Sequence, residues 1–306
     1  MANMKVTVLM STYNGHKYIK EQLDSLLRQT GVELRIIIRD DGSKDDTINI
    51  LADYESTHSN IIIIRDANCG AEESFNKLCK YALNQEPTDY YAFCDQDDVW
   101  EDDKLKVAVS KLQKLNSSRP NLYFSNLKMV DENLSYMRDF YRNGEVFTDK
   151  NKTLVQIFTY GCTCVFNHRA LEAYCKIEQN QVLHDNWIYA LCSYLGNVVY
   201  DPIGHILYRQ HGNNLSGHKE TGISLIKLRL GRAFKGNLGH DFETMAKQLL
   251  FYRNEIEHQD FKLINHVAFY RKKMLSKLFL LCSLKFRTGN LFKDLCIKYR
   301  VMLNSL

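Results

Sequence analysis

The segment YYAFCDQDDVW, residues 90–100, joins an apolar run to a cluster of acids. Its first part, residues 90–94, predicts a buried strand, and three carboxylates follow within four residues: Asp95, Asp97 and Asp98. Neighbouring carboxylates repel one another, and each loses solvation energy when it leaves water. A core strand that ends in such a cluster therefore points to a binding site at its carboxyl end.

Strand-like and helix-like segments alternate on both sides of this motif. The expected strands are 5–11, 34–40, 61–66 and 90–95, and the expected helices are 17–29, 45–56, 72–85 and 102–115. Near-continuous apolar strands that alternate with helices predict an α/β fold, with a mostly parallel sheet flanked by helices on both faces. Ligands in such sheets bind beyond the carboxyl ends of the strands. STYNG (11–15), DDGS (40–43) and DQDD (95–98) should therefore meet in one crevice.

The pattern changes after about residue 121. We expect strands at 121–131, 162–167, 197–201 and 205–212, helices at 151–158 and 184–196, and a polar loop with aromatic residues at 136–147. After residue 217 the sequence predicts helices throughout. This places a domain boundary near residue 220, between an α/β domain at 1–220 and a basic helical C-terminal extension at 221–306.

The composition is that of an ordinary globular protein, with 45% hydrophobic and 25% charged residues. The first residues lack the features of a signal peptide, and no apolar run approaches the ~20 residues of a transmembrane helix. The nine scattered cysteines favour reduced thiols and a cytoplasmic location. Cys162, Cys164 and His168 match no zinc spacing, so we expect the two cysteines to be buried small side chains.

Charge is unevenly distributed along the chain. Residues 223–306 carry 16 Lys and Arg against 6 Asp and Glu, which leaves 24 against 30 for the preceding residues. The tail mixes these basic residues with Leu, Ile and Phe at helical spacing, a pattern typical of helices that lie on an anionic membrane surface. A helical bundle that packs on the α/β domain, or on a second subunit of a homo-oligomer, is the alternative. The acidic motif disfavours nucleic acid, because carboxylates repel phosphates.

Clustered carboxylates in a short turn are hard oxygen ligands that suit Mg²⁺ or Mn²⁺, and such ions often share substrate phosphates. The chain has neither GxGxxG after its first strand nor GxxxxGK[ST], so neither the usual dinucleotide site nor a P-loop is expected. The alternative is that the acids only begin the next helix, whose N-terminus favours negative charge. The second acidic segment in the same crevice favours a metal-assisted site for a nucleotide diphosphate.

Three segments carry a family resemblance: VTVLMSTYNG (6–15), IIIRDDGSKDDT (36–47) and AFCDQDDVW (92–100). In this order and spacing they resemble the N-terminal half of family-two glycosyltransferases, which have the Rossmann-like GT-A fold. HDNWI (184–188) and YRQHGNN (208–214) extend the similarity more weakly. The forms DQDDVW and YRQHGNN resemble the bacterial rhamnosyltransferase-like branch, which builds surface polysaccharides.

The resemblance assigns nucleotide-binding roles to Ser11, Tyr13, Asp41 and Asp95, and metal-binding roles to Asp95 and Asp97. Ser11 and Tyr13 match positions that contact the nucleotide, with the Tyr ring against the base. Asp41 matches the carboxylate that accepts a hydrogen bond from the pyrimidine N3–H, a donor that uracil and thymine have and cytosine lacks. Asp95 and Asp97 match the DxD pair, the first near the ribose or metal and the second a metal ligand. Tyr13 as a core aromatic and Asp41 as a turn cap are the alternatives.

The resemblance also assigns the chemical step. Asp185 matches the catalytic base, and His184 stands where the family often has Glu, which puts the acceptor contacts in doubt. His211 matches a loop position that reaches the metal or diphosphate, and Arg209 would add positive charge. Asp98 is expected to be a secondary helper or a helix cap. Asp185 as a helix N-cap and His211 as an ordinary loop histidine remain alternatives.

These observations predict an inverting, metal-dependent glycosyltransferase that uses Mn²⁺ or Mg²⁺. The implied donor is a pyrimidine nucleotide-diphosphate sugar, with dTDP-L-rhamnose favoured and UDP-hexoses as competitors, and the implied acceptor is a glycan or a lipid-linked glycan. The expected location is cytoplasmic, with peripheral contact at the inner membrane face. Two alternatives stay open: a sugar nucleotidyltransferase, which would release pyrophosphate, and a non-catalytic nucleotide- or membrane-binding module.

Overall fold

The structure is a computed structural model that describes residues 4–211 and 242–306. Within these residues a nine-stranded sheet has the order β3-β2-β1-β4-β8-β6-β9-β5, and β7 pairs with β6 outside this path. The strands are β1 Met4–Thr12, β2 Val32–Asp40, β3 Ile61–Arg65, β4 Tyr90–Cys94, β5 Val99–Trp100, β6 Asn121–Val130, β7 Tyr136–Asp139, β8 Val165–Asn167 and β9 Asn197–Arg209.

The half of the sheet formed by β1 to β4 is parallel, as the alternating pattern predicts. β1 pairs in parallel with β2 and β4, and β2 pairs in parallel with β3. Leu9 of β1 lies beside both Ile37 and Phe93, so the apolar strands are in register. β8 is antiparallel to β4 and to β6, whereas β6 and β9 are parallel. The carboxyl ends of β1, β2 and β4 therefore lie at one edge of the sheet.

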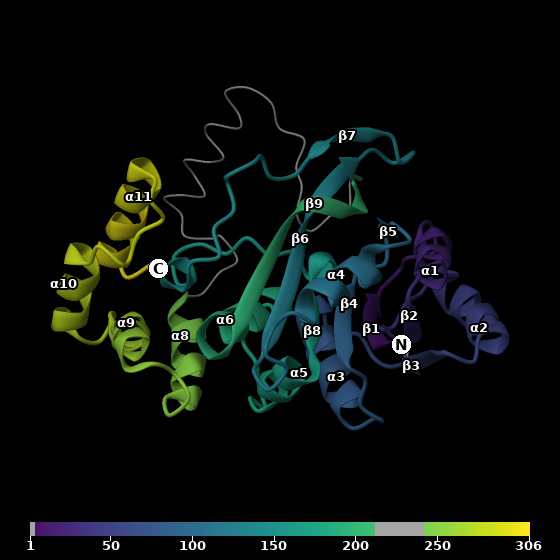
Figure 1. Ribbon diagram of the computed structural model, residues 1–306, viewed down its shortest axis with the longest axis horizontal. Coiled ribbons are helices and arrows are strands. Elements are labelled where there is room, and N and C mark those ends of the chain that lie inside the picture. Colours follow the sequence, from purple (N-terminus) through teal and green to yellow (C-terminus); the bar gives the residue numbers. More distant parts are fainter. Residues whose placement is uncertain (1–3, 212–241) are drawn as a thin grey trace.

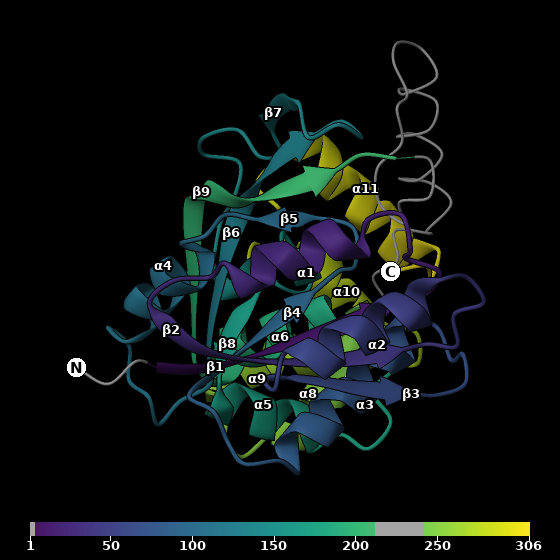
Figure 2. The ribbon, with the colours of Figure 1, turned by 90° about the vertical axis from the view of Figure 1, so that its right-hand side faces the viewer.

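Helices cover both faces of the sheet (Figures 1 and 2). The helices are α1 Ile19–Leu27, α2 Thr47–Thr57, α3 Ala71–Leu83, α4 Lys104–Leu112, α5 His168–Cys175, α6 His184–Leu195, α8 Phe242–Leu249, α9 His258–Phe269, α10 Met274–Cys282 and α11 Leu291–Met302, with 3-10 turns η1 Lys150–Lys152, η2 Gly161–Thr163 and η3 Leu250–Tyr252. One buried cluster lies under α1, α2 and α4, and another lies under α3, α5 and α6.

The side chains of β1 show why the middle of its sequence is largely apolar. Val8 and Met10 enter the cluster under α1, whereas Leu9 enters the opposite cluster under α3. Successive side chains of a strand point to opposite faces, so a strand that is covered on both sides is apolar throughout. The near-continuous apolar run in the sequence is thus explained by a sheet between two helical layers.

Several expected elements differ in the second half of the domain. The start of the expected loop at 136–147 is wrong, because β7 pairs there antiparallel with β6. The expected helix at 151–158 is reduced to η1, and α5, which was not predicted, follows β8 directly. The two strands expected at 197–201 and 205–212 are one strand, β9, whose pairing with β6 jumps from Asp201 to Gly204 and so passes Pro202.

The described part of the C-terminal extension is helical, and α8 and α9 share a core with the α/β domain. Met245 of α8 and Val267 of α9 belong to the same buried cluster as Trp187 of α6. The ring centroids of Trp187 and Tyr252 are 6.3 Å apart. The predicted domain boundary near residue 220 lies outside the described residues. The basic residues of the extension between 223 and 241 also lie outside them.

Candidate active site

The carboxyl ends of β1 and β2 are linked by a buried polar network. The hydroxyl oxygens of Ser11 and Ser74 lie 2.6 Å apart, which joins the end of β1 to α3. Arg39, at the end of β2, donates to Ser74 over 3.0 Å and to Oδ1 of Asp41 over 2.5 Å. The structure therefore brings together Ser11 and Asp41, two of the residues assigned to nucleotide binding.

Asp41 is a buried carboxylate that is held ionised. Oδ1 accepts hydrogen bonds from Arg39 and from the Cys69 N–H at 2.8 Å, and Oδ2 accepts one from the Gly70 N–H at 2.9 Å. Burial alone would raise the pKa of Asp41, but the hydrogen bonds from Arg39, Cys69 and Gly70 outweigh it and lower the pKa. The turn is capped by the preceding acid, Asp40, which accepts from the N–H groups of Gly42 and Ser43.

Arg39 organises this corner of the site, and the sequence interpretation did not include it. Its Nη2 donates to Asp66 over 3.0 Å and to the Ala67 carbonyl over 2.9 Å, in addition to the bonds from Nη1. The side chain is 1% exposed. A basic residue at the end of the run RIIIRD was the available signal, because a charge at the end of a buried strand needs a partner.

Gln96, inside DQDD, connects the acidic turn to β1. Its Oε1 accepts from the Thr12 hydroxyl at 2.7 Å and from the Tyr13 N–H at 2.8 Å, and its Nε2 donates to the Tyr13 carbonyl at 3.1 Å. The backbone of Tyr13 is thus fixed, while the residue is 43% exposed. This exposure fits a ring that meets a ligand better than a core aromatic.

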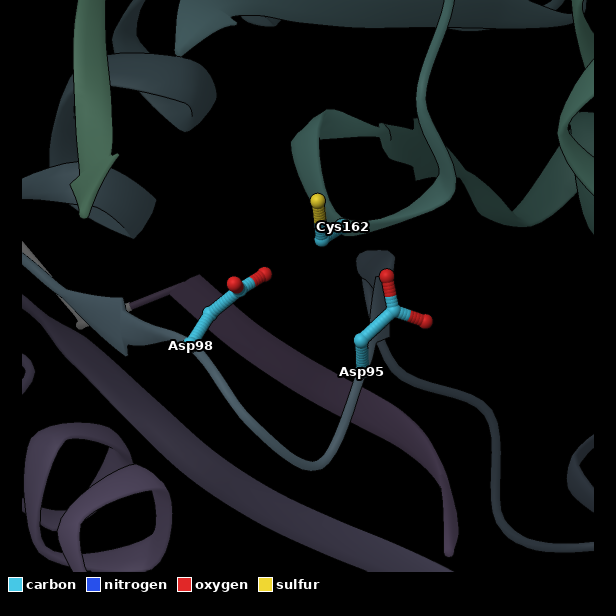
Figure 3. A group of neighbouring side chains, drawn as sticks. All are labelled: Asp95, Asp98 and Cys162. Carbon is cyan, nitrogen blue, oxygen red and sulfur yellow. The ribbon is translucent and has the colours of Figure 1, made fainter. Parts of the chain in front are cut away.

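Asp95 and Asp98 stand at the two ends of the turn after β4, with Cys162 of η2 beside them (Figure 3). One ligand atom from each of the three residues lies within 4.8 Å of the others. Burial, with the charge of Asp97 next in size, raises the pKa of Asp95 to about 7 and that of Asp98 well above its usual value. Oδ2 of Asp98 is buried and accepts no hydrogen bond from the described residues.

This arrangement fits a divalent cation. Close, poorly solvated carboxylates are unstable as anions, and a cation between them removes both the repulsion and the desolvation cost. Carboxylate oxygens suit Mg²⁺ and Mn²⁺, whereas a thiol is a soft ligand that does not. The carboxylates of Asp95 and Asp98 therefore fit the ion, and Cys162, whose thiol pKa burial raises, fits a neutral wall of the site.

Asp97 is tied to the end of β9. Nε2 of His211 lies 2.9 Å from Oδ2 of Asp97, and the His211 ring stacks on Tyr18 with centroids 5.0 Å apart. Arg209 donates from Nε to the Asp97 carbonyl over 3.0 Å, and its backbone N–H donates to Asp98 over 3.1 Å. His211 thus contacts Asp97, the residue that was predicted to be a metal ligand, and these contacts of Arg209 hold the turn.

Lys104 lies under the acidic turn, and the sequence interpretation did not include it. It is fully buried, its Nζ is 3.3 Å from the centre of the Trp100 ring, and this atom has no hydrogen-bond partner among the described residues. Burial lowers its pKa to about 8, although nearby thiols and Asp98 oppose the shift. A lysine in this position supplies positive charge beneath Asp98 and favours the ionised carboxylate.

Asp185 and His184 begin α6 on the other side of the crevice. Burial raises the pKa of Asp185 to about 6, and the charge of Asp185 is itself one of the causes of the raised pKa of Asp95. The two acids are therefore electrostatic neighbours. Oδ1 of Asp185 accepts from the N–H of Asn186 at 2.7 Å, which fixes the carboxylate at the start of the helix.

His184 has a mostly apolar environment. Its ring stacks on Phe75 with centroids 3.9 Å apart and meets the edge of Phe93 at 4.7 Å. Burial lowers its pKa to about 3, and neither ring nitrogen has a hydrogen-bond partner among the described residues. The ring is therefore neutral, and it fills space beside Asp185 in contact with α3 and β4.

The expectation for the cysteines agrees with the structure. Cys162 and Cys164 are buried, and all nine cysteines are free thiols. His168 is directed elsewhere, since its Nδ1 lies 3.1 Å from the Tyr91 hydroxyl. No zinc site is formed by this group within the described residues.

Comparison with known proteins identifies the class of enzyme. The family model described as glycosyl transferase family 2 matches residues 7–175, which include β1, β2, β4 and the acidic turn. The chain belongs to glycosyl transferase family 2, and it is a glycosyltransferase. Membership also decides against the two alternatives that the sequence left open, a nucleotidyltransferase and a non-catalytic module.

Two curated relatives are similar over different lengths. The dTDP-rhamnosyl transferase RfbG of Shigella flexneri is 34% identical over 226 residues, which cover 68% of this chain and 73% of that protein. The UDP-Glc:alpha-D-GlcNAc-diphosphoundecaprenol beta-1,3-glucosyltransferase WfgD of Escherichia coli is 27% identical over 133 residues, 44% of this chain and 49% of that protein. The first similarity supports the rhamnosyltransferase-like branch.

A solved structure supports the fold. The S. aureus TarS 1-349 structure in complex with UDP-GlcNAc superposes with a TM-score of 0.55 at 16% identity, covering 99% of this chain and 93% of that one. The fold is thus that of GT-A glycosyltransferases. Among the described residues, every helix is too short or too polar to cross a membrane.

Proposed function

We propose that this glycosyltransferase moves a sugar, with inversion, from a pyrimidine nucleotide-diphosphate donor to a glycan or lipid-linked acceptor in cell-surface polysaccharide synthesis. The observation that carries the proposal is the convergence of Asp41, Asp95 and Asp185 at the carboxyl edge of β1, β2 and β4. Such a reaction needs an ionised carboxylate that accepts a hydrogen bond from the nucleobase and an acidic turn that binds the diphosphate. It also needs a separate carboxylate that acts as the general base.

Asp41 would select the nucleobase of the donor. A carboxylate has about four lone-pair positions, and Oδ2 of Asp41 uses one of its two for the Gly70 N–H. The remaining position can accept the N3–H of uracil or thymine. Cytosine has no N3–H. Because hydrogen bonds lower the pKa of Asp41, its carboxylate stays ionised and cannot donate a proton to N3 of cytosine. The exposed ring of Tyr13 offers a stacking surface for the base.

The diphosphate would be bound at the acidic turn through Mn²⁺ or Mg²⁺. Asp95 and Asp97 would hold the ion, as the family resemblance implies, and His211 would lie beside Asp97. Asp98, whose carboxylate oxygen lies within 4.8 Å of that of Asp95, would assist them as a further ligand. When bound, the ion neutralises the negative charge that develops on the departing diphosphate. Arg209 holds the turn through its hydrogen bond to the Asp97 carbonyl, and the buried Lys104 balances the negative charge of the turn.

Asp185 would act as the general base. In an inverting transfer one carboxylate removes the proton from the acceptor hydroxyl as its oxygen attacks the anomeric carbon. The proton passes from that hydroxyl to Asp185, and the sugar–phosphate bond breaks on the opposite face. A pKa near 6 leaves the carboxylate ionised at neutral pH and more basic than an exposed aspartate.

We favour dTDP-L-rhamnose as the donor because of the similarity to RfbG, with UDP-hexoses as competitors. A lipid-linked acceptor would place the enzyme at the cytoplasmic face of the membrane. The proposal is tested by incubation with dTDP-L-rhamnose or UDP-glucose, Mn²⁺ and a lipid-extract acceptor. Metal-dependent release of nucleoside diphosphate, with inversion at the anomeric carbon of the product, supports it. Retention of configuration, or equal turnover in excess chelator, would overturn it.

A further inference from the structure

The helices α10 and α11 at the C-terminal end expose an unusual amount of apolar surface. They lie at the end of the long axis opposite α1 and α2 (Figure 1). On α10, Met274, Leu275 and Leu278 are 71%, 79% and 49% exposed. On α11, Leu291, Leu295 and Met302 are 79%, 59% and 52% exposed. We call these six side chains the α10–α11 face.

The apolar residues of α11 form one continuous stripe on its outer side. Leu291, Leu295, Tyr299 and Met302 are spaced by four, four and three residues, so they lie on one side of a helix. All four are exposed. Surface helices of globular proteins normally direct such a stripe at the core, and contiguous exposed apolar patches mark interaction sites.

The inner sides of these helices mix apolar and polar side chains, since Leu280, Ile297 and Val301 are buried together with Ser276 and Arg300. Ser276 of α10 is 2% exposed, and its hydroxyl oxygen lies 3.1 Å from Nδ1 of His266. Arg300 of α11 is 3% exposed and donates to the Ser305 carbonyl over 2.9 Å. Both helices thus bury one set of apolar side chains against the protein and expose a second set, which the described residues leave largely uncovered.

The surroundings of the face are strongly basic. Residues 271–306 contain nine Lys and Arg and a single acid, Asp294. Asp294 is occupied, since it accepts hydrogen bonds from the backbone N–H and the hydroxyl of Thr288. Lys272, Lys285 and Lys293 are exposed. Arg271 is paired with Glu243, but exposed lysines outnumber acids around the apolar side chains, and this combination complements a surface that is apolar inside and anionic outside.

We infer that the α10–α11 face docks on an anionic lipid bilayer, with its leucines and methionines in the acyl–headgroup boundary and its lysines on lipid phosphates. Helices with this composition lie in the plane of the interface, and each basic side chain near an anionic membrane favours binding. A second copy of the chain fits less well, because two faces with this charge repel each other. The inference deepens the proposed function, since it names the surface at which a lipid-linked acceptor would be met.

The direct test is co-sedimentation of the full chain with vesicles of phosphatidylglycerol and phosphatidylethanolamine in equal amounts, against vesicles of phosphatidylcholine alone. The double variant Leu291→Gln/Leu295→Gln removes the centre of the stripe. Its matched control is Ile203→Gln, because Ile203 is 59% exposed on β9, far from the face in the sequence. We expect the double variant to lower the partition coefficient on anionic vesicles by at least about tenfold, and the control to leave it unchanged.

A charge variant tests the electrostatic part independently. Lys285→Glu/Lys293→Glu should reduce binding by at least about tenfold, and added salt should weaken the wild type more than this variant. Lys114→Glu, an exposed lysine next to α4, is the matched control. Because all the substituted side chains are exposed, thermal melting curves should match the wild type.

Equal binding of the Leu291/Leu295 variant and the wild type to anionic vesicles would overturn the inference. So would a wild-type dimer in light scattering that this variant converts to monomers without any change in vesicle binding. Nucleotide titration separates this failure from failure of the proposed function. A chain that binds UDP or dTDP with Mn²⁺ but ignores vesicles retains the function and loses only the docking surface.

Discussion

The imidazole of His211 and the carboxylate of Asp97 meet at 2.9 Å, although they are 114 positions apart in the chain. Asp97 belongs to the turn after β4, and His211 follows the last residue of β9. The contact ties the acidic turn to the far side of the sheet. It also brings a ring nitrogen and a carboxylate oxygen to one place, and both are donor types that divalent cations accept.

Replacing Asp97 by Ala should abolish metal-dependent turnover. The substitution removes one proposed ligand and frees His211 from its partner, so Mn²⁺ should no longer strengthen nucleotide binding. Transfer assays and thermal shift with UDP, with and without Mn²⁺, measure both effects. Asp53→Ala, an exposed acid on α2, is the control and should behave as the wild type. Full metal-stimulated activity in Asp97→Ala would remove this residue from the metal site.

Replacing Asp185 by Asn should stop transfer and spare donor binding. The amide keeps the shape of the side chain but cannot take the proton of the acceptor hydroxyl, and loss of a general base costs about 10²–10⁴-fold in rate. Donor affinity should stay within about twofold of the wild type, because the proposed partner of Asp185 is the acceptor hydroxyl and not the nucleobase. A variant with near-normal turnover would show that another group accepts the proton.

Replacing Arg39 by Met should destabilise the protein and weaken nucleotide binding together. The buried Asp41 carboxylate would lose its charged partner, and breaking a buried ion pair costs about 3–5 kcal/mol. Arg35→Met on the same strand is the matched control, since Arg35 is partly exposed and should cost less than about 1 kcal/mol. Urea unfolding measures the difference. Similar losses in the two variants would contradict a special role for the Arg39–Asp41 pair.

His205 predicts a pH dependence of stability. Its Nδ1 lies 3.1 Å from Asp103, and Glu101, Asp201 and the bases Lys111 and Lys128 surround it. The carboxylate of Asp201, 3.8 Å from Nε2, and that of Asp103 raise the pKa of His205 in spite of its burial. A raised folded-state pKa stabilises the fold at low pH, and the contribution is lost as pH rises through that pKa.

The stabilisation by His205 should therefore be complete below its unfolded pKa of about 6.5 and decline above it. Denaturant unfolding of the wild type and His205→Gln at a series of pH values measures this. The difference in unfolding free energy between the two proteins should become smaller as pH rises. It should not reach zero, because the neutral ring of His205 is still buried. A gap that widens with pH would show that the folded state prefers the neutral ring.

The sequence predicted the parts of the fold that follow from local periodicity. β1 to β4 and their helices were found because buried parallel strands are apolar at every position and the helices between them are not. Residues 136–139 and the expected helix at 151–158 were not predicted correctly. β7 was missed because it is exposed along its length and is defined only by pairing with β6. Such pairing depends on residues that are distant in sequence.

The residues of the candidate site also divide into those that the sequence could predict and those that it could not. Asp41, Asp95 and Asp97 could be located because each follows a strand whose end the sequence marks. Arg39, Gln96 and Lys104 were missed, because each has a chemical role only through contacts made in the folded chain. Gln96 was visible within DQDD, yet its bonds to the Tyr13 backbone depend on the parallel pairing of β1 and β4.

The measurement that tests the central claim most directly is a calorimetric titration of the wild type with UDP, dTDP and GDP, with and without Mn²⁺. The account predicts that UDP or dTDP binds and that Mn²⁺ strengthens this binding. It predicts that GDP binds more weakly, because the N–H donors of guanine belong to a larger purine ring and would not meet Asp41 at the position of the pyrimidine N3–H. Absence of binding by all three nucleotides, or binding that Mn²⁺ leaves unchanged, would contradict a metal-assisted pyrimidine nucleotide site at the acidic turn.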